Sequence, residues 1–289
     1  MNQPAPDPNL QNNNKDIIAA AKKLKKEEGR RRAIEIARQR KAAAQQSNEV
    51  EAAKRSTSTR HGARNQRRHQ KFTKWLLDTF DLKKDSFVLD VAGGKGELAA
   101  RLAYCHHVNV CIIDPREANV SKCFEDVVLR GLPKKWQQIF QQNLTDNKEF
   151  LAEEMDKRVH QIVSCLHDGI LSSKPYTSAG NGSTVDKRDV LSYEMFKAAQ
   201  DCSLIIGMHA DNATEAIVDV AMALKKPFVV VPCCVFPNLF CNRVLSDGTK
   251  VRSHEQFCRY LAEKDDRFSV ETLPFDGRNV AIWWRPPND

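Results

Sequence analysis

Residues 86–96 read Ser-Phe-Val-Leu-Asp-Val-Ala-Gly-Gly-Lys-Gly, and this stretch decides the fold. Its apolar first half is typical of a buried strand, and its glycines are typical of a turn between a strand and a helix. Glycine lets the backbone approach a ligand closely and adopt positive φ, and a helix beginning at Glu97 presents free amides at its N-terminus. We therefore expect a loop that holds a polar small molecule.

Two nucleotide-type cofactors fit this loop. Residues 94–99, GKGELA, satisfy the G-x-G-x-x-G/A fingerprint of dinucleotide binding, and Asp114 follows the next predicted strand, near where a ribose-binding acid belongs. Asp90 favours the other cofactor, because a carboxylate directly before the glycines would repel a pyrophosphate. S-adenosylmethionine has no phosphate, and its sulfonium and ammonium groups would be attracted to that carboxylate.

The same residues resemble the first motif of the class I S-adenosylmethionine-dependent methyltransferases, which is a hydrophobic strand, an acid and G-x-G-x-G. Ala92 stands where that family usually has its first glycine. The resemblance implies that Asp90, Gly94 and Gly96 line the methionine side of the cofactor and that Asp114 binds the ribose. The cofactor-binding residues expected on this basis are Asp90, Ala92, Gly93, Gly94, Gly96, Asp114 and Pro115.

Charge divides the chain into two regions. Residues 1–75 contain 19 Lys and Arg against 7 Asp and Glu, a net charge of +12, whereas the whole chain carries +8. We expect a basic, partly disordered or helical arm over 1–59 and a methyltransferase-like domain over 60–289. The first 14 residues are too polar to offset the entropy of ordering, and residues 15–54 are rich in helix formers without a sustained apolar stripe.

The arm has two interpretations. It is a tail, a nuclear-import signal or a protein contact, with basic runs at 22–26 and 30–32, or it is an electrostatic clamp on RNA. The arm contains no aromatic residue on which a base could stack, so it does not support sequence-selective binding of single strands.

Residues 60–80 join the arm to the domain. Apolar side chains recur at three- and four-residue spacing from Phe72 to Phe80, which predicts a helix docked on the domain. The cationic face just before them includes Arg68 and His69. That face is either a solvated surface or a group that binds the cofactor carboxylate or an RNA phosphate.

Beyond the glycine loop, strand and helix patterns alternate. This alternation predicts an α/β fold, a Rossmann-like seven-stranded, mostly parallel sheet with helices on both faces, and the resemblance implies a terminal antiparallel pair. Strands are expected at 86–91, 108–113, 138–143, 203–208, 227–232, 267–273 and 279–285, and helices near 96–105, 117–130, 147–158, 188–200, 213–225 and 253–264. The Gly-, Pro- and Ser-rich segment 172–186 predicts an exposed loop, either a substrate lid or a plain insertion.

Two predicted strands end in polar or thiol groups, at the edge where ligands bind in open α/β sheets. His209 and Asp211 follow the fourth strand and are candidate catalytic residues, as a general base or as groups that orient the nucleophile. The alternatives are a core or helix-capping histidine and an N-cap aspartate. A wall of the substrate pocket is expected after the fifth strand, at Pro232, Cys233 and Cys234.

These two segments sharpen the resemblance. The His-Ala and Ala-Thr pairs within 209–214, together with Pro-Cys-Cys at 232–234, resemble the branch that includes eukaryotic tRNA ribose 2′-O-methyltransferases and methyltransferase-like proteins with a glutathione-transferase C-terminal domain. Asp211-Asn212 replaces the Cys-Gly that is common in that branch. No N/D-P-P-Y/F/W follows the fourth strand, which argues against methylation of an exocyclic amine.

Covalent catalysis by the thiols is not expected, because the second Pro-Cys pair that cytosine-5 RNA methyltransferases carry after the preceding strand is absent. We expect direct displacement of the methyl group from the sulfonium, with RNA as the acceptor. The alternatives are a protein or small-molecule acceptor, or a non-catalytic module of this fold that binds RNA or a protein partner.

The nine cysteines show neither the paired spacing of a disulfide framework nor that of a zinc site, so no metal is expected. No secretory segment and no apolar run of transmembrane length is found. We therefore expect an intracellular protein of the cytoplasm or nucleus without a membrane partner. The sequence predicts no particular oligomeric state.

Overall fold

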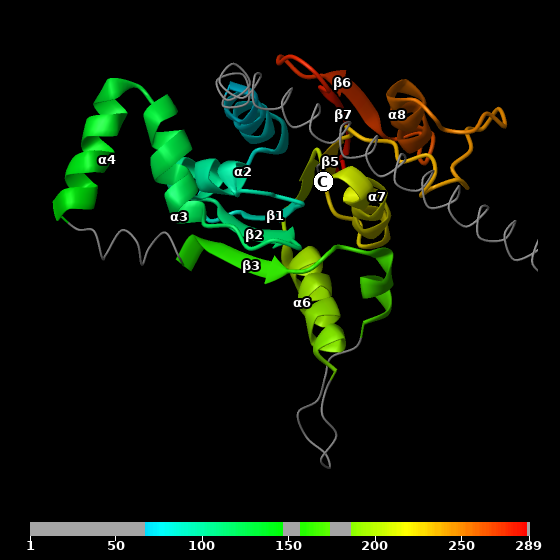
Figure 1. Cartoon of the computed structure of the whole chain (residues 1–289), viewed down its shortest axis with the longest axis horizontal. Helices are drawn as coiled ribbons and strands as arrows, with labels where there is room; N and C mark the ends of the chain where they lie inside the picture. Colours follow the sequence, from blue (N-terminus) through cyan, green and yellow to red (C-terminus); the bar gives the residue numbers. More distant parts are fainter. Residues whose placement is uncertain (1–66, 147–156, 174–185, 288–289) are drawn as a thin grey trace, which may run out of the picture. The chain divides into compact units, whose positions relative to one another are not determined.

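A computed structural model describes residues 67–146, 157–173 and 186–287. Its seven strands form one sheet in the order β3-β2-β1-β4-β5-β7-β6 (Figure 1). β1 to β5 are parallel, and β7 runs antiparallel to both β5 and β6. The mostly parallel α/β sheet with a terminal antiparallel pair is confirmed. The strands are β1 (Phe87–Val91), β2 (Asn109–Asp114), β3 (Val159–Val163), β4 (Leu204–Met208), β5 (Phe228–Val231), β6 (Ser269–Thr272) and β7 (Val280–Trp284).

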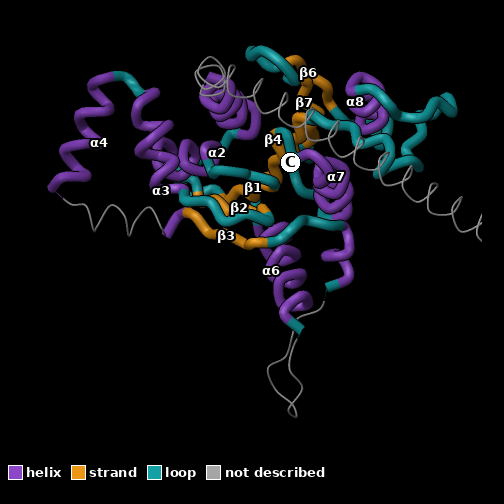
Figure 2. The backbone as a smooth tube through the Cα atoms, in the orientation of Figure 1, coloured by secondary structure: helices purple, strands orange, loops and turns teal. Residues whose placement is uncertain are grey.

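Helices lie on both sides of the strands (Figure 2). A helix over 67–80 precedes β1. Two short α-helices continue directly as π-helical turns, α2 into η1 and α3 into η2. The remaining bounds are α2 (Glu97–Ala100), η1 (Arg101–Cys105), α3 (Val120–Cys123), η2 (Phe124–Leu129), α4 (Lys134–Asp146), η3 (Asp168–Ser172), α6 (Lys187–Asp201), η4 (Asp211–Ala213), α7 (Thr214–Ala223) and α8 (His254–Ala262).

The sheet has a separate apolar core on each face because successive side chains of a strand point to opposite sides. In β1, Val88 belongs to the core that contains the helix over 67–80, α2 and α3. Leu89 and Val91 belong to the core that contains α6, α7 and α8. β4, which lies at the centre of the sheet, is buried along its whole length.

One predicted strand is wrong. Residues 138–143 lie in α4, and the third strand of the sheet is Val159–Val163, which pairs with β2. Pro133 directly precedes α4, and its carbonyl accepts the first hydrogen bonds of the helix, from the amides three and four residues later, at 2.9 and 3.1 Å. β3 escapes prediction because it is an edge strand in which only Ile162 is buried, so it shows no apolar run.

The basic arm at 1–59, most of the predicted helix at 147–158 and most of the loop at 172–186 lie outside the described residues, so these expectations stay predictions. Among the described helices, none has the length and apolar character needed to cross a membrane.

A buried arginine fixes the segment that follows β5. Arg243 is 3% exposed; its Nε donates to Glu215 Oε2 at 2.7 Å, and its Nη1 donates to the Val235 carbonyl at 2.9 Å. The guanidinium lies over the rings of Phe240 and Phe257, with its central carbon 3.7 and 4.4 Å from the ring centroids. These contacts hold the chain just beyond β5 against α7 and α8.

Candidate functional site

The glycine loop connects β1 to α2 in an unusual backbone conformation. Ala92, Gly94 and Gly96 have φ angles of 57°, 60° and 76°, in the left-handed region that favours glycine. Ala92 therefore has a strained backbone, whereas a glycine could adopt the same φ without strain. Gly93 is constrained by space, because a Cβ there would lie 2.7 Å from Asp90 Oδ2. The loop thus passes directly against the Asp90 carboxylate.

Asp90 is the buried acid of this region. It is 2% exposed, and its Oδ2 has no hydrogen-bond partner among the described residues. Burial, and secondly the negative charge of Asp114, raise the pKa of Asp90 to about 7. A buried carboxylate with an unpaired oxygen is costly unless a cation or donor reaches it, so this position suits a positively charged ligand.

Asp114 ends β2 and is bound to the glycine loop. Its Oδ2 accepts a hydrogen bond from the Gly94 amide at 3.0 Å, and its Oδ1 accepts from the Arg116 amide and Nε at 2.9 and 3.1 Å. Burial alone would raise the pKa of Asp114, but the hydrogen bonds from Arg116 and Gly94 outweigh it and hold the pKa below its usual range. Asp114 is therefore ionised at neutral pH. Pro115, beside it, is exposed.

The helix over 67–80 is packed firmly on the sheet. Phe72 and Leu76 are fully buried, and the Trp75 indole meets the ring of Trp283 in β7 edge-on, with 6.1 Å between centroids. Such burial of aromatic and aliphatic side chains fixes the position of the helix and of the residues at its start.

The first turn of that helix brings Arg68 and His69 to two different strand ends. Arg68 Nη1 lies 3.3 Å from His209 Nε2, and His69 Nδ1 lies 3.0 Å from Glu97 Oε2. Glu97 is the first residue of α2, directly after the glycine loop. Both predicted residues therefore stand beside the predicted site, and each is engaged with a protein side chain.

His209 follows β4 with a φ of 60°, and its amide donates to the Val231 carbonyl of β5 at 3.0 Å. Burial and, secondly, the charge of Arg68 lower the pKa of His209 to about 4, so the ring is neutral at physiological pH. A guanidinium has no acceptor atom, so Arg68 donates to Nε2 and the ring proton is on Nδ1. Nε2 becomes a free acceptor only when Arg68 moves away.

Asp211 contacts the thiols that follow β5. The Cys233 Sγ donates to Asp211 Oδ1 at 2.9 Å, and the Cys234 Sγ lies 3.6 Å from that of Cys233. The N-cap interpretation of Asp211 is wrong, because Ala213 occupies the N-cap of α7. Burial raises the pKa of Cys233, and the hydrogen bond to Asp211 raises it further, so the thiolate that a covalent mechanism needs is disfavoured.

The same three side chains could hold a thiophilic metal ion. Ligand atoms of Asp211, Cys233 and Cys234 lie within 4.8 Å of one another. Two sulfurs and one oxygen would supply three of the four ligands of a tetrahedral Zn²⁺. The expectation of no metal stays a prediction.

Comparison with known proteins gives the family. Residues 64–236 match a family described as a methyltransferase domain. The chain belongs to this family. The match contains every site residue named above, from Arg68 to Cys234. The protein is an S-adenosylmethionine-dependent methyltransferase, and its cofactor is S-adenosylmethionine. Among curated proteins, none matches the methyltransferase.

Several solved structures resemble the methyltransferase at low identity. The methyltransferase domain of bacterial CtHen1-CN is 16% identical over 76% of this chain and 97% of that one, with a TM-score of 0.39. Magnesium protoporphyrin IX methyltransferase (ChlM) from Synechocystis PCC 6803, with bound SAM, is 13% identical over 78% and 81%, with a TM-score of 0.37. MtNAS in complex with MTA and tNA is 8% identical, with a TM-score of 0.36; the match covers 76% of this chain and only 61% of that one.

The residues of the methyltransferase fit its cofactor. Asp90 offers a buried oxygen without a partner beside a loop that leaves no room for a side chain at Gly93, which suits a cationic group held close to the backbone. Asp114 is ionised and aligned by Gly94. Its oxygens also accept from the exposed Arg116 side chain, and once that side chain moves away they can accept the hydrogen bonds of two neighbouring hydroxyls.

Two residues of the site escape sequence analysis. Glu97 binds His69 and, through its other oxygen, Arg101 at 2.9 Å, and Arg116 binds Asp114. Both follow a predicted site residue by one or two positions, Glu97 after Gly96 and Arg116 after Asp114. Closeness in sequence to a predicted site residue points to such residues, but ordinary residues of a helix surface or a turn show the same closeness.

Proposed function

We propose that the methyltransferase acts on RNA, by direct displacement of the methyl group onto an acceptor atom, and that it belongs to the branch that includes tRNA ribose 2′-O-methyltransferases. The observation that carries the RNA proposal is the positive charge of the segment that precedes the site in the sequence and includes one of its residues, Arg68. Residues 1–75 have a net charge of +12, and Arg68 within them reaches His209 at the end of β4. Positive charge at this density attracts the phosphates of nucleic acids.

When bound, S-adenosylmethionine supplies an electrophilic methyl group on a sulfonium centre. Direct displacement asks the protein chiefly for positioning and for exclusion of water. In our proposal Asp90 and the loop from Gly93 to Gly96 hold the methionine part, and Asp114 holds the ribose. Pro232 and the two thiols beyond it form a wall of the acceptor pocket.

We propose that binding of the acceptor separates Arg68 from His209. A phosphate beside Arg68 would compete for its guanidinium, because Arg pairs with phosphate through charge-assisted hydrogen bonds. Release of Arg68 leaves His209 Nε2 as an acceptor for the proton of a hydroxyl or amine. The neutral ring is ready for this role, since its pKa of about 4 keeps it unprotonated at physiological pH.

The test is transfer of tritium from labelled S-adenosylmethionine into unfractionated cellular RNA and protein by the full chain. We expect label in RNA, and little label with the Asp90→Ala variant. Lys250→Ala removes an exposed lysine far from the site along the chain and should behave as the wild type.

Label in protein alone would overturn the RNA proposal. Titration calorimetry with S-adenosylmethionine and with NAD(P) provides the second readout. Binding to neither cofactor would contradict enzymatic function and favour a non-catalytic module.

A further inference from the structure

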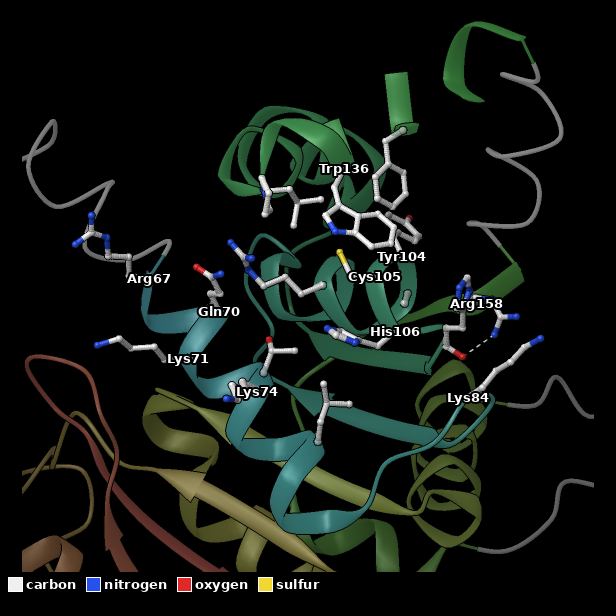
Figure 3. Close-up of a pocket in the computed structure, with 18 residues that line it drawn as sticks. Arg67, Gln70, Lys71, Lys74, Lys84, Tyr104, Cys105, His106, Trp136 and Arg158 are labelled. Atoms are coloured by element: carbon white, nitrogen blue, oxygen red, sulfur yellow. Dashed lines mark hydrogen bonds between the residues drawn. The ribbon is translucent and has the colours of Figure 1, made fainter. Parts of the chain in front are cut away.

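A cavity of about 1140 Å³ lies away from the cofactor loop. Its walls are the helix over 67–80, η1 and the start of α4 (Figure 3). Its floor includes residues that directly precede strands, namely Lys84 before β1, His107 before β2 and Arg158 before β3. The cavity is therefore at the amino ends of the strands, whereas the cofactor loop and His209 are at the carboxyl ends.

The lining of the cavity is strongly basic. Among the described residues that line it are six lysines and arginines and two histidines, but no aspartate or glutamate. Two of the six cations have acidic partners outside the lining, Arg101 with Glu97 and Arg158 with Asp85. The other four, Arg67, Lys71, Lys74 and Lys84, are exposed, and no ion pair to a described carboxylate is found for them. Lys71 donates to the Pro274 carbonyl, which leaves Arg67, Lys74 and Lys84.

An aromatic residue stands at the rim of this basic cavity. Trp136 in α4 is 53% exposed, and its indole lies beside Tyr104 and Cys105 (Figure 3). The wall behind it is rigid, because Phe124 packs edge-on against Tyr104 and Phe140, with centroids 5.0 and 5.3 Å apart. An exposed indole on a fixed wall is a surface for stacking.

We infer that this cavity binds single-stranded RNA, with phosphates at Arg67, Lys74 and Lys84 and a base stacked on Trp136. The inference rests on the proposed function, for which it supplies an anchoring site separate from the point of methyl transfer. An acidic peptide would satisfy the cations but has no general need for an exposed indole, whereas every base has a face that stacks.

The position of the cavity along the chain supports this occupant. The basic residues 1–66 lead directly into the helix that forms one wall, and they contain no aromatic residue. Trp136 supplies the stacking surface that this segment lacks. A strand held by the arm would therefore gain a base contact at the cavity.

Binding of a labelled, unstructured RNA oligonucleotide to the full chain, followed by fluorescence anisotropy at several salt concentrations, tests the inference. Trp136→Ala should weaken binding about tenfold, and Trp136→Phe should restore most of it. The double variant Lys74→Gln/Lys84→Gln should weaken binding and make the slope of log affinity against log salt shallower by about 1.5. Lys250→Gln is the control for loss of an exposed lysine elsewhere.

Unchanged affinity in both Trp136→Ala and the lysine double variant would overturn the inference, and so would tighter binding of polyglutamate or of DNA of the same sequence. Thermal melts should show that the variants stay folded, since the replaced side chains are exposed. The assay contains neither cofactor nor turnover. If RNA binds at the cavity but the transfer assay puts no label into RNA, only the proposed function is contradicted. If RNA is labelled but the cavity variants bind RNA as the wild type does, only the inference about the cavity is contradicted.

Discussion

Replacing Asp90 by Asn should change how the stability of the free protein depends on pH. The pKa of Asp90 is raised from 3.8 to about 7 because the side chain is buried and stands near Asp114. Since the folded-state pKa lies above the unfolded value, the stabilisation from the protonated carboxyl is complete below the unfolded pKa and is lost as the pH rises through 7. Because proton binding is linked to folding, the ionisation of Asp90 alone should lower the free energy of unfolding by about 3 kcal/mol between about pH 5 and pH 8.5.

Urea denaturation at both pH values measures this loss. The wild type should lose about 3 kcal/mol more than Asp90→Asn over the interval, because Asn has the same shape and no charge to bury. Asp266→Asn, which removes an exposed carboxylate, should follow the wild type. An equal loss in the wild type and Asp90→Asn would refute the reasoning that Asp90 is a buried acid with a raised pKa.

The same carboxylate should make cofactor binding depend on pH. If the cationic cofactor binds the ionised form of Asp90, its affinity should rise about tenfold between pH 6 and pH 8. In Asp90→Asn the affinity should be weaker and flat over this range. Calorimetry in matched buffers distinguishes the two, and a flat profile in the wild type would count against contact between Asp90 and the cofactor.

Gly93→Ala should weaken cofactor binding in calorimetry, because a Cβ at Gly93 would meet the Asp90 carboxylate at 2.7 Å; unchanged affinity would contradict the close packing of the loop. Arg243→Met should cost about 3 kcal/mol in chemical denaturation, since it leaves a half-buried acid without its buried partner, and a loss below about 0.5 kcal/mol would show the pair to be dispensable. Asp211→Asn should speed iodoacetamide labelling of Cys233 at pH 8, measured by mass spectrometry, because the carboxylate that raises the thiol pKa is gone. Equal labelling rates would refute that coupling.

Local sequence was sufficient to predict the structure where a single segment determines both a secondary-structure element and its role in the site. The run from Phe87 to Gly96 has strand residues, an acid and glycines in the order that a parallel sheet needs, and β1, the loop and α2 form there. It was insufficient where distant segments meet. Neither the contact of Arg68 with His209, 141 positions apart, nor that of Asp211 with Cys233, 22 apart, follows from spacing.

The errors have a similar physical cause. Ile139 and Phe140 resemble a short strand, but Pro133 starts a helix in which Trp136 and Phe140 share one face. The polar β3 is a strand only because β2 offers it a partner edge. A single sequence does not contain that information.

The antiparallel strands at the end of the sheet, β7 and β6, lie beyond the residues that match the family, and β5 depends on them. The family match ends at residue 236, soon after β5, yet β5 is a run of four fully buried residues, Phe228 to Val231, whose outer edge pairs with β7. Without the last 50 or so residues, this strand would present unpaired backbone and an apolar, uncharged edge to solvent, which is a template for aggregation. β7 and β6 thus act as a protective border, and a fragment cut at the end of the match should associate through β5.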